Sequence, residues 1–339
     1  MHNQDPTLTQ KISERVAQKQ AKATAEEQDW NFLQKFTRRL TRKTGAGRSL
    51  SLLQQLVLQL FLGFIAFTVL YPILWIFSLS LSPTDDIRPK ELVLIPEGAT
   101  LESYREVIEQ PTPNPASFSQ LFYNSFRLSF FTALASVLIG VFAAYAFSRL
   151  RFAGRQVLMI AVLTVLMLPA IATLPALFVL LNKVVFGAGE NLFNLRNSLW
   201  GVGVAVLSGL LPFAIWNLKG YLDTIPKELE EAALIDGCTP NQAFFLVTLP
   251  LALPALAVTG FLGFMSTWSE FAISWQFLTK PEDFTLTMAL YGMVGQFSGL
   301  TPWSKFAAFA ILVALPVSLI YLYLQKYIVG GLALGGVKG

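Results

Sequence analysis

The sequence predicts an all-α integral membrane protein with six transmembrane helices and with both termini in the cytoplasm. Three observations support this fold class: the composition, the long intervals without charge, and the uneven placement of Lys and Arg. Of 339 residues, 54% are hydrophobic and 14% are charged. Soluble domains carry roughly a quarter charged residues, so the composition argues strongly against an ordinary soluble enzyme.

Residue counts also limit the chemistry of this chain. It has one Cys and one His, His2, which argues against a disulfide framework, a zinc cluster and His-based catalysis. The 28 Phe residues exclude an intrinsically disordered chain. We therefore expect no catalytic residue, no metal site and no cofactor held by this chain.

Uncharged intervals predict the membrane crossings, because a spanning helix needs about 20 residues with little charge. Six such intervals are rich in Leu, Val, Ile, Ala and Phe. A seventh, residues 284–304, contains several Gly and polar residues, and we interpret it as an extracytoplasmic loop with a short helix; a membrane segment there remains the alternative. The six intervals lie between Arg48 and Asp85, Arg127 and Arg149, Arg155 and Lys183, Arg196 and Lys219, Asp236 and Glu270, and Lys305 and Lys326.

The positive charges predict the orientation, because Lys and Arg concentrate on the cytoplasmic side of membrane proteins. Most of the 25 Lys and Arg lie in residues 1–54, in the predicted loops after the second and fourth spans, and in the tail. The first apolar run begins near Leu56, too late for a cleavable signal peptide, so we expect it to remain as an anchor. The predicted parts are a basic cytoplasmic extension (1–54), a transmembrane domain (55–330) and a cytoplasmic tail (331–339).

The basic extension is expected to lie against the anionic headgroups of the lipid bilayer. A specific partner-binding arm is the alternative. Nucleic acid is not an expected partner, because the net charge is only +4 and there is no array of aromatic residues for base stacking.

The loop 219–250 is predicted to project into the cytoplasm as two short helices. Pro226 suits the first turn of a helix that carries Glu228, Glu230 and Glu231. Gly237 stands where a helix end needs positive φ. Thr239, Pro240 and Gln242 then form the pattern of a capping box. One interpretation is that the loop is only a well-capped connection between two spans. The functional interpretation is that it is a rigid projection that docks on a cytoplasmic partner.

This loop resembles the EAA motif of the permeases of ABC importers. It contains Glu231-Ala232-Ala233, then Gly237, then Val247 in the usual Ile position, and then Leu249-Pro250. The stretch from Ala144 to Phe152 resembles the AYAFxRxRFPG segment of the carbohydrate branch, with Ala153 in place of Pro. Asn124-Ser125 precedes the second predicted span as in those permeases. The ending from Gly331 to Gly339 resembles that of the smaller permease subunit of maltose-type transporters.

The resemblance implies a set of partners. Such a permease pairs with a homologous companion permease, sits on a dimer of cytoplasmic ATPases that bind ATP and Mg, and receives substrate from an extracytoplasmic sugar-binding protein. It implies that the EAA loop is a coupling helix that docks on one ATPase, and that the tail also reaches the ATPases. The implied coupling residues are Glu231, Ala232, Ala233, Gly237, Leu249 and Pro250, and the implied tail residues are Gly335, Gly336, Val337, Lys338 and Gly339.

The substrate path is less clearly marked. Pro169 and Pro175 are expected to interrupt the third span, and Pro254 the start of the fifth. Trp268, Glu270 and Trp275 near the outer end of the fifth span are candidates for the path, because aromatic faces beside polar groups suit sugar rings. An interfacial aromatic belt is the alternative. The resemblance also implies contact with the binding protein around Gln296 and Trp303.

The predicted function is a non-catalytic permease subunit of an ATP-driven sugar importer in a bacterial or archaeal cytoplasmic membrane. Maltose-like oligosaccharides are the expected substrates. The chain has no Gly-x-x-x-x-Gly-Lys-Ser/Thr loop, so a partner must hydrolyse the ATP. Import of another sugar, a polyol or a sugar phosphate is the first alternative. A secondary transporter would usually show mid-membrane charges and an internal repeat, and a membrane enzyme would need reactive side chains that are scarce here.

Overall fold

The computed structural model describes residues 52–84, 93–186, 193–294 and 301–335 of the chain. The predicted extension therefore lies outside the described residues up to residue 51, as do Gln296 and the tail from residue 336. The chain divides into two compact units, Met1–Ile73 and Leu74–Gly339.

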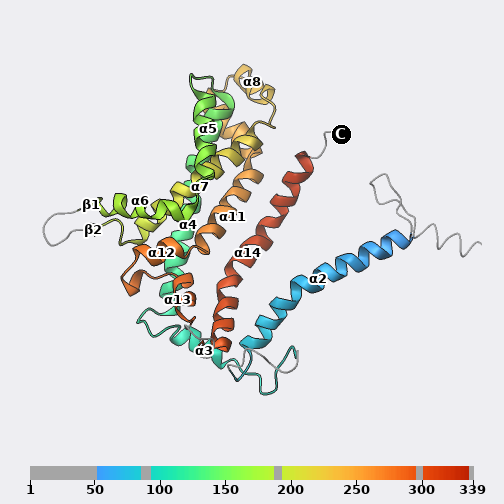
Figure 1. The fold of residues 1–339 in the computed structure, drawn as a ribbon. Coiled ribbons are helices and arrows are strands. Elements are labelled where there is room, and N and C mark those ends of the chain that lie inside the picture. Colours follow the sequence, from blue (N-terminus) through green and yellow to red (C-terminus); the bar gives the residue numbers. More distant parts are fainter. Residues whose placement is uncertain (1–51, 85–92, 187–192, 295–300, 336–339) are drawn as a thin grey trace, which may run out of the picture. The chain divides into compact units, whose positions relative to one another are not determined.

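The regular secondary structure of the described residues is helical apart from one pair of two-residue strands (Figure 1). The strands, β1 and β2, pair in antiparallel register, with Val185 opposite Asn194. The elements in chain order are α2 (Leu52–Ser80), α3 (Glu102–Glu109), α4 (Phe118–Arg149), α5 (Arg155–Leu166), α6 (Ala170–Asn182), β1 (Val185–Phe186), β2 (Phe193–Asn194), α7 (Leu199–Leu222), α8 (Glu228–Ile235), α9 (Pro240–Ala243), the π-helical segment η1 (Phe244–Thr248), α10 (Leu249–Leu251), α11 (Leu253–Trp268), α12 (Ala272–Phe277), the 3-10 helix η2 (Pro281–Asp283), α13 (Leu286–Gly292) and α14 (Trp303–Gly335).

Among the described residues, four helices are long and apolar enough to cross a membrane: Leu53–Ser80, Phe118–Arg149, Leu199–Leu222 and Trp303–Lys326. The pair Pro240–Leu251 and Leu253–Trp268, bent by 71°, forms a fifth candidate span. These helices define a multi-pass membrane protein. The predicted bend before Pro254 is confirmed, because Pro254 occupies the first turn of α11, where its missing N–H breaks no helical bond.

The third predicted span is not one continuous helix. It is divided into α5 and α6, which are 12 and 13 residues long, and Figure 1 shows them running in different directions. Pro169 stands at the N-cap of α6 in an extended conformation, with a φ of −61° that its ring imposes. The second expected interruption does not occur, since Pro175 lies inside α6.

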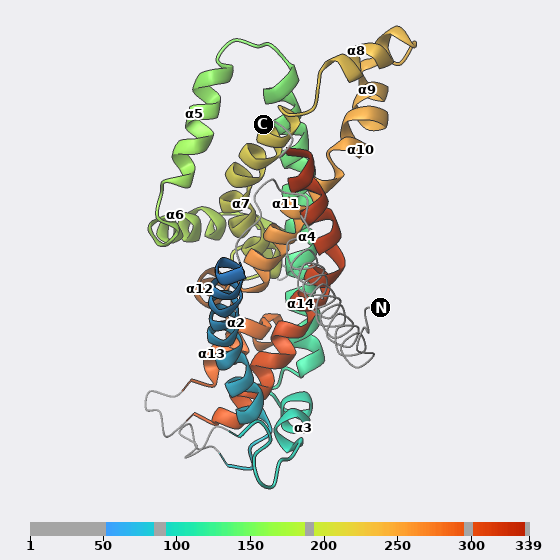
Figure 2. The same ribbon diagram turned by 90° about the vertical axis from the view of Figure 1, so that its right-hand side faces the viewer.

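Unit 2 is organised around α4, which packs along α7 on one side and α11 on another (Figures 1 and 2). Small residues allow the close approach: a Cβ on Gly140 would lie 3.1 Å from Ala214, and one on Gly263 would lie 3.1 Å from Ser136 Oγ. Without a strong hydrophobic driving force in lipid, such close contacts carry much of the helix association.

The two ends of unit 2 carry different segments. The connecting loop, residues 223–252 between α7 and α11, holds α8, α9, η1 and α10 at one end (Figure 2). Residues 281–292, here called the far segment, comprise η2 and α13 and lie with α3 at the other end. The expected short helix in 284–304 is confirmed by α13, while residues 295–300 lie outside the described part.

Candidate functional site

The connecting loop turns sharply at Gly237. Gly237 has φ of 96°, a left-handed conformation that L-residues with a Cβ rarely adopt. The Cys238 N–H donates to the Ala233 carbonyl at 2.9 Å, and the Gly237 N–H donates to the Leu234 carbonyl at 3.1 Å. This pair of bonds is the Schellman arrangement, which satisfies carbonyls left free at a helix end. The predicted glycine turn after α8 is confirmed.

The second helix of the loop begins with the predicted capping box. Thr239 Oγ1 accepts from the Gln242 N–H, and the Gln242 side chain accepts from the Thr239 N–H at 2.8 Å. Pro226 differs slightly from the prediction, because it precedes the N-cap Lys227 rather than lying within α8. The helix after the box also changes to π geometry over Phe244–Thr248, a form often found at functional positions.

A buried ion pair fastens the connecting loop to α4. Arg149 Nε donates to Glu230 Oε1 at 2.6 Å, and the two side chains are only 6% and 12% exposed. The remaining donors of Arg149 reach the Ile225 carbonyl at 2.9 Å and Ser148 Oγ at 3.1 Å. Tyr145 donates its hydroxyl to the second oxygen of Glu230 at 3.2 Å. Both charges are thus compensated by directed hydrogen bonds, as burial requires.

A second polar contact lies beside the first. Ser148 Oγ donates to Asp223 Oδ1 at 2.6 Å, and Lys219 Nζ donates to Asp223 Oδ2 at 2.5 Å. Burial acts to raise the pKa of Asp223, but the hydrogen bonds from Lys219 and Ser148, with the charges of Lys219 and Arg155, lower it below its usual value. Asp223 therefore stays ionised and holds the end of α7 to the last turn of α4.

The predicted coupling residues lie together on the α8–α10 part of the loop. Glu231 and Ala232 are exposed, whereas Ala233 is buried against the loop. Apolar side chains are also exposed there, above all Ile235 at 86% and Leu246 at 66%. Leu249 and Pro250 are the first two residues of α10, just before the bend into α11. The loop thus presents a rigid surface of mixed apolar and acidic character away from the spans.

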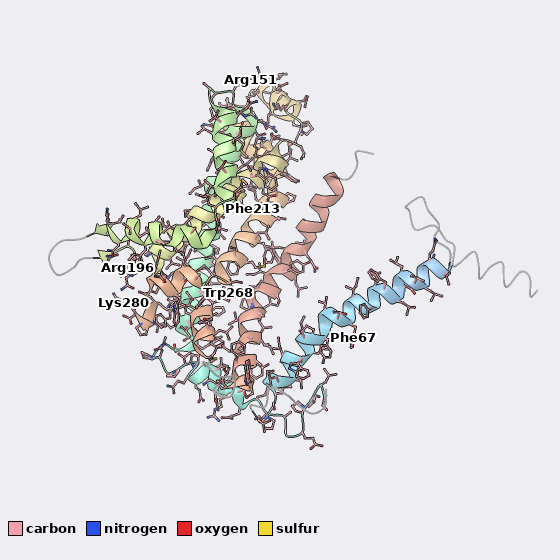
Figure 3. All side chains as sticks on the ribbon, in the orientation of Figure 1. Phe67, Arg151, Arg196, Phe213, Trp268 and Lys280 are labelled. Atoms are coloured by element: carbon pink, nitrogen blue, oxygen red, sulfur yellow. The ribbon has the colours of Figure 1, made fainter. Side chains whose placement is uncertain are left out.

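The three candidates for the substrate path have different surroundings. Trp268 is buried and donates its Nε1–H to the Val313 carbonyl of α14 at 3.1 Å, near the far end of α11 (Figure 3). Glu270 accepts from the N–H groups of Ile273 and Ser274 at 2.5 and 3.0 Å, so its carboxylate caps α12. Trp275 is 51% exposed and can meet a ligand.

Trp275 also lines a cavity of about 390 Å³ together with Thr112, Pro113, Asn114, Leu278, Phe284, Met288, Ala289 and Gly292. An exposed aromatic ring beside an amide side chain offers both stacking and hydrogen bonds. Trp303 begins α14, and its ring packs on Phe306 at 5.9 Å. Gly335 ends α14, while Gln296 and the tail from Gly336 to Gly339 lie outside the described residues. In the described part, no cluster of three or more His, Cys, Asp or Glu could hold a metal ion.

Sequence reasoning missed the residues that hold the loop in place. The sequence marks Arg149 as the charge that ends the second predicted span and as part of a motif, and Glu230 as an acid favourable at a helix N-terminus. Asn124 and Ser125 were placed before the second span but lie inside α4, which begins at Phe118.

The geometry defines a multi-pass helical membrane protein with a rigid, fastened loop at one end of its spans. Residues 136–333 match the model of the family described as the binding-protein-dependent transport system inner membrane component. The chain belongs to this family.

Curated relatives match over most of the chain. It is 35% identical over 280 residues to the galactooligosaccharides transport system permease protein GanQ of Bacillus subtilis strain 168, covering 83% of this chain and 94% of that protein. It is 35% identical over 289 residues to the maltose/maltodextrin transport system permease protein MalG of Escherichia coli K12, with the same shares of 83% and 94%.

Solved structures show the same fold. A chain from a bacterial ABC transporter involved in the import of the acidic polysaccharide alginate matches with a TM-score of 0.63 and 24% sequence identity. The match covers 80% of this chain and 95% of that one.

Proposed function

We propose that this chain is the permease subunit of an ATP-driven, binding-protein-dependent importer of oligosaccharides. The family match and the sugar-transporting permeases among the relatives support this function. Maltodextrin-like and galactooligosaccharide-like chains are the substrate class we favour. The subunit forms half of the translocation pathway beside a companion permease and contributes no catalytic residue.

The coupling role is supported above all by the way the connecting loop is held in one conformation. Its α8 is closed by the Gly237 turn, followed by a capping box, and tied to α4 by the buried Arg149–Glu230 pair. A loop held in this way can transmit a push, whereas a flexible one cannot. The exposed face, with Glu231, Ala232 and Ile235, is the surface that we assign to the cleft of a cytoplasmic ATPase.

In the proposed topology, the chain crosses the membrane six times and both termini lie in the cytoplasm. The α5–α6 pair then forms a third, broken span, which is tolerated in a membrane where the break is covered by protein or lines a water-filled cavity. The connecting loop faces the cytoplasm and the far segment faces outward. A bacterial or archaeal cytoplasmic membrane is the location that suits this arrangement.

The partners follow from the same proposal. An ATPase dimer binds ATP and Mg and drives the cycle, and a sugar-binding protein delivers the substrate at the outer face, near Trp303 and residue 296. ATP-driven closure of the ATPases pushes the connecting loop, and the spans move between inward-open and outward-open states. The tail from Gly335 onward is a second proposed contact with the ATPases.

The test is purification of the tagged chain from its native membrane, identification of the co-purifying proteins, and uptake by proteoliposomes. Recovery of a second multi-span chain and a Walker-containing ATPase, with maltodextrin uptake that requires ATP and a binding protein, supports the proposal. Recovery of the chain alone, with solute uptake that needs no ATP, contradicts it and indicates a secondary transporter.

A further inference from the structure

Three side chains on one face of α4 hold the connecting loop. Phe142, Tyr145 and Arg149 are three and four residues apart, a spacing that places them along one side of a helix. The Phe244 ring of η1 lies 5.6 Å from the Phe142 ring and 4.6 Å from the Tyr145 ring, measured between centroids. Arg149 adds the buried pair with Glu230 of α8. The loop is therefore fixed to α4 by an aromatic contact and an ionic one.

The opposite end of α4 holds the far segment in a comparable way. The Asn124 side-chain amide donates to the carbonyls of Glu282 and Phe284 at 2.7 and 3.0 Å. Ser125 Oγ accepts from the Leu286 N–H at 2.8 Å. Both side chains are almost fully buried, at 4% and 3% exposed. The backbone of the far segment is thus bonded directly to α4 before α13 begins.

Between these two attachments α4 is one unbroken helix. It runs for 32 residues without proline, and at 1.5 Å per residue Ser125 and Arg149 are about 36 Å apart along its axis. The two long helices that the chain joins to the connecting loop, α7 and α11, are by contrast not continuous with the helices of the loop. Residues 223–227 separate α7 from α8, and the chain bends by 71° where α10 meets α11.

Along its middle, α4 contacts its neighbours through small residues that permit sliding, while Ser148 in its last turn is hydrogen-bonded to Asp223 at the end of α7. Gly140 faces Ala214 of α7, and Gly263 of α11 faces Ala133 and Ser136. Small side chains present a smooth surface, and small shear movements of packed helices are a common way for proteins to change state. Movement of α4 would displace the far segment, which supplies Phe284, Met288 and Gly292 to the 390 Å³ cavity beside Trp275.

We propose that α4 is the lever that carries movement of the connecting loop to the far segment, with Arg149 and Asn124 as the positioning residues at its two ends. This inference rests on the proposed function, because it assumes that a partner ATPase pushes the loop. Through α4, movement of the connecting loop would reach the 390 Å³ cavity beside Trp275. The inference also assigns Asn124, far from any ATPase contact, a role in coupling.

The experiment uses the full chain assembled with its ATPase, companion permease and binding protein in proteoliposomes. A fluorophore on Lys280→Cys, in a Cys238→Ser background with cysteine-free partners, reports on the far segment, since Lys280 is exposed immediately before η2 (Figure 3). ATP hydrolysis, maltodextrin uptake and the ATP-induced fluorescence change are measured on the same assembled samples. The variants are Asn124→Ala, Arg149→Ala and the milder Arg149→Lys. The control is Arg105→Ala, which removes an exposed ion pair with Glu109.

We expect Asn124→Ala and Arg149→Ala to lower uptake and the fluorescence change by about tenfold, which is within the usual range of coupling between sites. ATP hydrolysis should persist, Arg149→Lys should be intermediate, and Arg105→Ala should match the wild type. Two results overturn the lever: a full fluorescence change in both alanine variants, or hydrolysis that falls in parallel with uptake. Absence of ATP-dependent uptake by the wild-type chain would instead contradict the proposed function.

Discussion

The Arg149 guanidinium lies 2.6 Å from the Glu230 carboxylate, and this contact joins the last turn of α4 to the first turn of α8. The residues are 81 positions apart in the chain. Both charges are removed from solvent, so their desolvation is offset only while both partners and their hydrogen bonds are in place. The ion pair therefore adds little net stability to the fold. Its main effect is to favour one position of the connecting loop.

The first prediction follows from this balance. Arg149→Met leaves Glu230 buried without its partner and should lower the free energy of unfolding by about 3–5 kcal/mol, whereas Arg149→Met/Glu230→Leu should cost much less. Thermal unfolding of the detergent-solubilised chain measures both. Arg105→Met, at an exposed pair, should change the midpoint little. A double variant that is less stable than the single variant would contradict the argument.

The second prediction concerns the turn at Gly237. Gly237→Ala forces a Cβ into the left-handed region, which costs roughly 1–2 kcal/mol, and Gly237→Pro also removes the N–H that donates to Leu234. Both should reduce ATP-dependent uptake, the proline variant more strongly. Gly220→Ala is the matched control, because no atom lies within 4 Å of its added Cβ and its φ is not positive. Wild-type uptake by Gly237→Pro would contradict the docking role of a rigid loop.

Local features of the connecting loop could be predicted because their signals span only a few residues. The left-handed Gly237, the Thr239–Gln242 capping box and the bend before Pro254 depend on backbone conformations that particular side chains favour. The apolar intervals likewise predicted the positions of the four long apolar helices α2, α4, α7 and α14. Such features are nearly independent of the rest of the fold.

Contacts between distant segments could not be read from the sequence. Nothing local to Glu230 distinguishes it from Glu228 or Glu231, since only the packing of α8 on α4 turns it inward to Arg149. The same holds for Asn124, which binds backbone carbonyls that any residue would provide. The split of the predicted third span into α5 and α6 was foreseen only as an interruption at Pro169, because hydropathy does not record the direction of a helix.

The third prediction tests the close contact between α4 and α11. A Cβ on Gly263 would lie 3.1 Å from Ser136 Oγ and 3.5 Å from Ala133 Cα, so Gly263→Val should overpack this interface. Overpacking typically costs about 1–3 kcal/mol. Gly209→Val in α7 is the control, because it introduces the same β-branched residue into a helix with no atom within 4 Å of the new Cβ. Equal thermal midpoints for the two variants would show that α4 and α11 do not pack this closely.

The last prediction concerns Asp283 at the end of η2. Burial raises the pKa of its carboxyl above the ordinary value of 3.8, Glu282 acts in the same direction, and Lys280 and Arg127 oppose them. The folded protein therefore binds this proton more tightly than the unfolded chain does. The stability that this group contributes is full below the ordinary pKa and is lost as pH rises through the raised one.

Asp283→Asn keeps the side chain neutral at every pH and should be more stable than the wild type near neutral pH. The difference should shrink as pH falls through the raised pKa of Asp283. Thermal unfolding over a pH series measures it, with the exposed Glu97→Gln as a control for removing one negative charge. An Asp283→Asn variant that is less stable than the wild type at neutral pH would show that Lys280 and Arg127 outweigh burial. The carboxylate would then be an ionic support of the far segment.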